Sequence, residues 1–166
     1  NQKLKKNIIS FFLSFSFFTI ANAQSPFQGT WKWDNNNNRL YVFIKSETLT
    51  NGSKVLSLDY KMVSINNGIE TEIYSSKING QFFWAGAILA EYPNGASGLI
   101  HDKTHPDTED GYEGRFSLII LPPQAGSTIP RIHWRIRKFS DYMQPAVTNN
   151  PPDDFNLPVD IILTKI

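Results

Sequence analysis

The sequence predicts an all-β domain, folded as an antiparallel up-and-down β-barrel or a barrel-like sandwich of about 8–10 strands. Three observations support this class. Short apolar segments alternate with clusters of asparagine, glycine and proline, the segments have a two-residue apolar period, and no window keeps the i, i+3, i+4, i+7 spacing of an amphipathic helix. We therefore expect residues 24–166 to form a single β domain.

The two-residue period is clearest in residues 54–65, where Leu56, Leu58, Tyr60 and Met62 alternate with mostly polar side chains. Side chains of an extended strand point alternately to its two faces. The pattern therefore predicts one buried and one exposed face, as antiparallel sheets commonly have.

Five strands are expected in the first half of the domain, each followed by a turn cluster. Asparagine and glycine tolerate positive φ, so Asn-Gly pairs between apolar runs favour type I′ hairpin turns. The clusters are Asn35–Asn38, Asn51-Gly52, Asn66–Gly68, Asn79-Gly80 and Tyr92–Gly95. The strands are Gln28–Asp34, Arg39–Glu47, Lys54–Ile65, Ile69–Ile78 and Gln81–Glu91.

Four strands are expected in the second half. They are Ser97–Lys103, Glu113–Leu121, Arg131–Phe139 and Val159–Lys165. The connection from Ser140 to Pro158 contains four prolines. Because proline cannot donate a ladder hydrogen bond, we expect this connection to be a surface loop outside the sheet.

The first 23 residues resemble a secretory leader. Lys3, Lys5 and Lys6 form a basic head, an uncharged apolar run follows, and Ala21-Asn22-Ala23 has the small-residue pattern of a cleavage site. The apolar run is shorter than the ~20 residues that a membrane-spanning helix needs. We expect cleavage after Ala23, a product beginning at Gln24, a secreted or periplasmic location, and no membrane span after processing.

Charge and composition limit the function classes. The chain has 16 Lys plus Arg and 15 Asp plus Glu, and three of the lysines lie in the leader, so residues 24–166 are weakly acidic. Such a domain has no general electrostatic attraction for nucleic acid or an anionic membrane. The absence of cysteine excludes thiol catalysis, cysteine-ligated zinc and a lipid-modified cysteine at the cleavage site.

The motif Phe27-x-Gly29-Thr30-Trp31 resembles the Gly-x-Trp opening of lipocalins and other calycins. That resemblance implies a tryptophan that plugs one end of a small barrel beneath a basic residue of a late strand, here Arg135, Arg137 or Lys165. We expect Gly29 and Trp31 to have this structural role.

The chain also resembles an uncharacterised family of short secreted proteins from Bacteroidetes-type bacteria. The Phe-x-Gly-Thr-Trp start, the Ile78-Asn79-Gly80 turn and Trp134 carry this resemblance. It implies a β fold and assigns no activity.

An aromatic strand provides the first candidate binding site. Phe82 and Trp84 share one strand face, beside small residues, and could line a hollow barrel together with Leu118 and Trp134. The alternative is that this segment is a core strand with packed aromatic rings.

A basic strand provides the second candidate. Arg131, His133, Arg135 and Arg137 share one strand face and could capture an anionic group, since arginine binds planar anions with paired hydrogen bonds. The alternative is an exposed face whose arginines pair with acids such as Glu113.

A dense polar cluster contains two imidazoles and several carboxylates that could bind a divalent metal ion. Its spacing matches neither the H-E-x-x-H motif nor a calcium loop, so we interpret it as an acidic hairpin tip and predict no metal and no cofactor. The cluster comprises His101, Asp102, His105, Asp107, Glu109, Asp110 and Glu113.

These observations favour a non-catalytic protein that binds a small apolar, amphipathic or anionic ligand. A second interpretation is a structural or interaction protein with a solid core that meets a protein partner through its sheet surface. A hydrolase is third, because glycoside hydrolysis needs only two placed carboxylates. Those available are Glu70, Glu72, Glu91 and Glu113.

Overall fold

A computed structural model describes residues 25–82, 85–102, 104, 112–138 and 155–166. These residues form eleven strands, and no helix among them is long and apolar enough to cross a membrane. The strands are β1 (Gly29–Asn35), β2 (Asn38–Thr48), β3 (Lys54–Asn66), β4 (Ile69–Ser75), β5 (Lys77–Ile78), β6 (Gln81–Phe82), β7 (Gly86–Tyr92), β8 (Gly95–Asp102), β9 (Tyr112–Ile120), β10 (Arg131–Lys138) and β11 (Asp160–Lys165).

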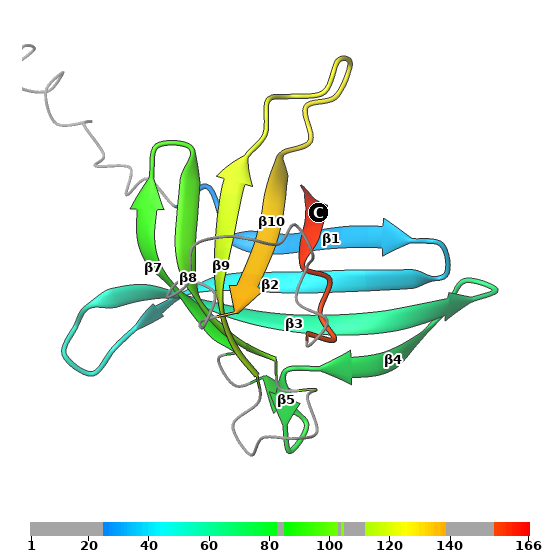
Figure 1. Cartoon of the computed structure of the whole chain (residues 1–166), viewed down its shortest axis with the longest axis horizontal. Helices are drawn as coiled ribbons and strands as arrows, with labels where there is room; N and C mark the ends of the chain where they lie inside the picture. The colour runs from blue at the N-terminus through cyan, green and yellow to red at the C-terminus, as the bar shows by residue number, and fades with distance from the viewer. Residues whose placement is uncertain (1–24, 83–84, 103, 105–111, 139–154) are drawn as a thin grey trace, which may run out of the picture.

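Eight of the strands close into an antiparallel barrel. Its circular order is β1-β2-β3-β7-β8-β9-β10-β11, and the ring closes where Trp31 pairs with Lys165 and Lys32 pairs with Thr164. In Figure 1, β1 to β3 run across the view while β7 to β10 run steeply past them. Each barrel strand pairs with the barrel strands before and after it in the chain, so the predicted all-β, up-and-down barrel is confirmed.

The segment between β3 and β7, which contains β4, β5 and β6, differs from the predicted strand pattern. The single strands expected over Ile69–Ile78 and Gln81–Glu91 are each interrupted. The first break is at Ser76, which is fully buried, donates its backbone N–H to Tyr60 O at 3.0 Å, and donates its hydroxyl to Asp59 Oδ1 at 3.0 Å. These bonds to β3 end β4, and the short hairpin of β5 and β6 follows.

The turns follow the predicted chemistry at two of the four Asn-Gly pairs; Asn94-Gly95, where β8 begins, has no positive φ. Asn67 and Gly68 have φ of 51° and 78°, and Asn79 and Gly80 have 51° and 80°. These values are those of type I′ turns, which need positive φ at both central residues. In the pair before β3, the positive φ occurs at Gly52.

Alternating side chains fill the barrel interior. On β10, Ile132, Trp134 and Ile136 are buried, and on β9 Phe116 and Leu118 face them from the paired strand. The Phe116 and Trp134 rings stack with their centroids 5.6 Å apart. The interior between these strands is therefore occupied by packed side chains.

Chain segments cover both ends of the barrel. At the end where β1 begins, Phe27 is completely buried above Trp31. At the opposite end, residues 155–159, here called the strap, run from β4, where the Tyr74 hydroxyl donates to Asn156 O, to β10, where Trp134 Nε1 donates to Pro158 O. Asp102, completely buried, accepts hydrogen bonds from the backbone N–H groups of Asn156 at 2.7 Å and Leu157 at 3.3 Å. Asp102 thus fixes the strap to β8.

Candidate functional site

Among the described residues of the predicted aromatic site, the structure pairs Leu118 with Trp134 and places Phe82 on a separate strand. Leu118 and Trp134 are fully buried partners across β9 and β10. Phe82 lies on β6, outside the barrel sheet, and its ring contacts Phe43 with 5.0 Å between centroids. Trp84 lies outside the described residues. The interior contacts of Leu118 and Trp134 are those of a packed core.

The basic face of β10 points away from the interior. Arg135 and Arg137 alternate with the buried residues of this strand, so neither lines the barrel. Arg135 and His133 both contact Asp160 of β11, with His133 Nε2 2.5 Å and Arg135 Nη2 2.9 Å from its carboxylate. Hydrogen bonds from His133 and then Arg135 hold the pKa of Asp160 below its usual value. The acid that pairs with this face is therefore Asp160, where the sequence suggested Glu113.

The plug predicted at Gly29 and Trp31 has a defined geometry. The Trp31 side chain is 1% exposed, and its indole N–H donates to Phe27 O at 2.7 Å. Of the three basic residues left open by the sequence, Lys165 lies over the ring, with Nζ 5.3 Å from the ring centroid. Gly29 has a φ of +132°, and a Cβ there would lie 2.8 Å from Lys165 Cε. A glycine at residue 29 accommodates both the backbone and the lysine stem.

The residues of the polar cluster, a candidate metal site in the sequence, do not form one site among the described residues. Asp102 accepts hydrogen bonds from Asn156, Leu157 and Thr104, so its carboxylate holds the strap. His105, Asp107, Glu109 and Asp110 lie outside the described residues. Within the described ranges, no group of three or more His, Asp or Glu side chains is arranged to hold a metal ion.

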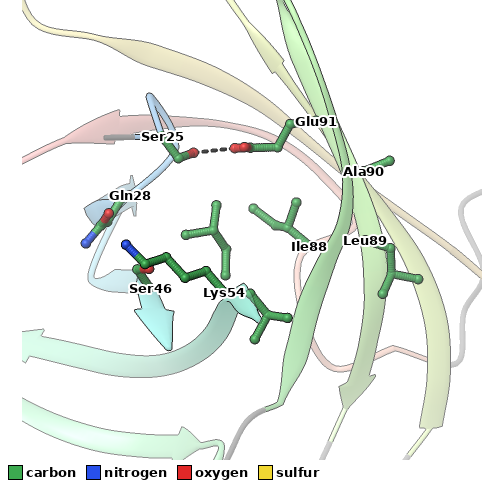
Figure 2. A pocket seen from close by; sticks show the side chains of 10 residues that line it. Ser25, Gln28, Ser46, Lys54, Ile88, Leu89, Ala90 and Glu91 are labelled. Carbon is green, nitrogen blue, oxygen red and sulfur yellow. Dashed lines mark hydrogen bonds between the residues drawn. The ribbon is translucent and has the colours of Figure 1, made fainter. Parts of the chain in front are cut away.

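A pocket of about 580 Å³ lies at the plug end of the barrel. It lies between the segment before β1, the end of β2, the start of β3, and β7 (Figure 2). We call it the rim pocket. Its lining consists of Ser25, Gln28, Ser46, Lys54, Val55, Leu56, Ile88, Leu89, Ala90 and Glu91.

A β-bulge in β7 places an acid and an apolar side chain on the same side of the strand. The pairing of β7 with β8 shifts between Ile88 and Ala90, so Ile88 faces Gly98 and Glu91 faces Ala96. In a regular strand these two side chains, three residues apart, would point to opposite faces. The extra residue of the bulge brings them to the same face. Figure 2 shows Ile88 and Glu91 projecting toward the pocket, while Leu89 and Ala90 project from the other side.

Apolar and polar groups are separated within the rim pocket. Leu56 and Ile88 are paired residues of β3 and β7, and they form an apolar wall. Beside this wall, the Ser25 hydroxyl donates to the Glu91 carboxylate. The Lys54 ammonium has no acidic partner within ion-pair distance among the described residues. The pocket thus combines an apolar wall with one ammonium group, on Lys54, and one carboxylate, on Glu91, that do not pair with each other.

Sequence reasoning did not find this pocket. Of its lining, only Glu91 had been considered, as one of four carboxylates for a hydrolase. The lining contains one carboxylate, whereas glycoside hydrolysis needs two. The bulge carries no sequence motif, because Ile88-Leu89-Ala90 is also compatible with a regular strand.

No protein-family model matches the chain, and neither do curated protein sequences or solved structures.

Proposed function

We propose that this protein is a non-catalytic binding protein that takes a small amphipathic molecule with an anionic head into the rim pocket. The observation that carries the proposal is Lys54, a cation without an acidic partner among the described residues, beside the apolar wall of Leu56 and Ile88. An anionic head would pair with Lys54 and an alkyl chain would cover the wall. Export through the N-terminal leader would place this binding activity outside the cytoplasm.

The filled interior supports a site at the rim. Burying a ligand in the barrel interior beside β9 and β10 would require displacement of Phe116 or Trp134, which are 1% and 0% exposed. Removing such core side chains costs several kcal/mol. A molecule in the rim pocket displaces no core side chain, so its binding energy is not offset by loss of packing.

Titration with decanoate tests the proposal, because it has a carboxylate head and a short alkyl chain. We expect saturable binding near one molecule per chain, with a micromolar dissociation constant as a reasonable upper limit of affinity. Isothermal titration calorimetry would measure it. Decanol, which has the same chain and no charge, should bind less tightly.

A matched pair of lysine variants assigns the site. Lys54→Met should weaken decanoate binding by up to about fivefold, since Lys54 is exposed and an exposed ion pair contributes at most about 1 kcal/mol. Lys45→Met removes an exposed lysine of β2 that is not part of the lining and should leave binding unchanged. Equal affinities of the two variants, or no saturation with the parent protein, would refute the proposed site.

The second candidate is an interaction protein with a solid core. Its specific support is the packed interior together with exposed isoleucines on β4, where Ile69 is 70% exposed and Ile73 is 52% exposed. Failure of every amphiphile to bind, with retained association through β4, would favour this candidate over the first.

A further inference from the structure

One edge of β4 has no strand partner among the described residues. Residues 61–66 of β3 pair with β4 on one side, and β4 ends the nine-strand order. Such an edge leaves alternate backbone N–H and C=O groups available to another strand. Proteins commonly protect an edge with charged residues, above all lysine, with proline or with a β-bulge. β4 contains neither lysine nor proline, it carries two glutamates, and its one bulge against β3 is at Ile73. Its exposed isoleucines, Ile69 and Ile73, add apolar surface.

The sequence on this edge is a palindrome. Residues 69–73 read Ile-Glu-Thr-Glu-Ile, with Thr71 at the centre. If two copies of the strand pair antiparallel about Thr71, each side chain faces one of its own kind. Ile69 then meets Ile73 of the second copy, and the two Thr71 side chains meet at the two-fold axis. Apolar pairs and Thr–Thr pairs across strands are stabilising.

The glutamates of the palindrome already have partners that reduce their mutual repulsion. Arg39 Nη1 lies 2.9 Å from Glu70 Oε1, which also accepts a hydrogen bond from Tyr41 at 2.7 Å. Lys77 Nζ lies 2.8 Å from Glu72 Oε2. In the antiparallel pair, Glu70 with its arginine would face Glu72 of the second copy with its lysine. Each carboxylate pair is thus flanked by two cations.

We propose that the β4 edge is a self-association surface, at which two copies of this chain pair antiparallel about Thr71 and continue one sheet across both molecules. The contact is isologous, as in most homodimers. A pair of short strands covers less area than a stable interface needs, so the dimer is weak and its fraction depends on concentration.

Sedimentation equilibrium of the purified full chain over a wide concentration range tests the proposal. We expect the mean mass to rise from monomer toward dimer. Thr71→Lys puts two ammonium groups together at the axis and should raise the dissociation constant about tenfold or more. Thr71→Val keeps the β-branched shape and should retain the dimer. Thr71 is exposed, so both variants should unfold at the parent's urea midpoint.

A cross-linking experiment tests the register independently. The chain has no cysteine, so a single introduced thiol can form only an intermolecular disulfide. Thr71→Cys should oxidise to a covalent dimer faster than Asn51→Cys, because Asn51 is also exposed but lies in the β2–β3 turn, away from the proposed two-fold axis. A monomer at all concentrations, a dimer indifferent to Thr71→Lys, or equal oxidation rates would overturn the proposal.

Discussion

Replacing Trp31 by alanine tests whether the plug end is a structural part of the core. The indole is 1% exposed, lies beneath Lys165, and donates to Phe27 O at 2.7 Å. Truncation removes almost the whole buried ring and leaves the Phe27 carbonyl without this donor. Core aromatic-to-alanine changes cost ~3–5 kcal/mol. Trp31→Phe keeps most of the apolar volume and loses the hydrogen bond, so it should cost about 1–2 kcal/mol.

Urea denaturation followed by circular dichroism measures both costs. For a domain of this size the slope is about 2 kcal/mol per molar urea, so Trp31→Ala should lower the midpoint by about 1.5–2.5 M. Tyr92→Ala is the control, because Tyr92 is an aromatic side chain that is 59% exposed. A Trp31→Ala midpoint equal to that of Tyr92→Ala would refute the plug and with it the structural basis of the calycin comparison.

Four further outcomes are expected. Gly29→Ala should destabilise the protein by about 1–3 kcal/mol, because φ of +132° is costly for a residue with a Cβ, and the urea midpoint measures the loss. Asp102→Ala should cost about 1–3 kcal/mol for each strap N–H left unpaired, with faster hydrogen exchange at those amides. The pKa of Asp160 is lowered in the folded state, so near that pKa the folded state binds fewer protons than the unfolded state. The contribution of Asp160 to stability should therefore be lost as the pH falls below about 4. Asp160→Asn should make the urea midpoint less dependent on acid pH. Mass spectrometry of exported protein should show Gln24, free or cyclised, as the first residue, whereas an intact leader would contradict the predicted cleavage.

Much of the barrel is predictable because its strands are locally encoded. The alternation in residues 54–65 corresponds to β3, Lys54–Asn66, and the Asn-Gly pair at residues 67–68 makes the expected type I′ turn. Each of these features depends on the strand's own sequence. The two-residue apolar period and the turn-forming residues are therefore sufficient to locate these features.

Features that depend on distant residues were not predictable. Ser76 interrupts a predicted strand because it bonds to β3, and Lys165 becomes the cation over Trp31 only when β1 and β11 pair. The candidate site depends on such pairings too. The bulge beside Leu89 sets the direction of Glu91, and nothing in the local alternation reveals it. The outward direction of Arg135 likewise follows from which face of β10 the barrel encloses.

The pairing of Trp31 with Lys165 also has a kinetic consequence. This ladder joins strands near opposite ends of the described chain. The entropy cost of closing so long a loop is offset only after the intervening hairpins have formed. Until β11 docks, β1 and β10 each present an unpaired edge, and Trp134 lies in an unsealed interior. Refolding should therefore take milliseconds to seconds, with an open intermediate that aggregates as protein concentration rises. Dilute refolding conditions should recover the closed barrel in the highest yield.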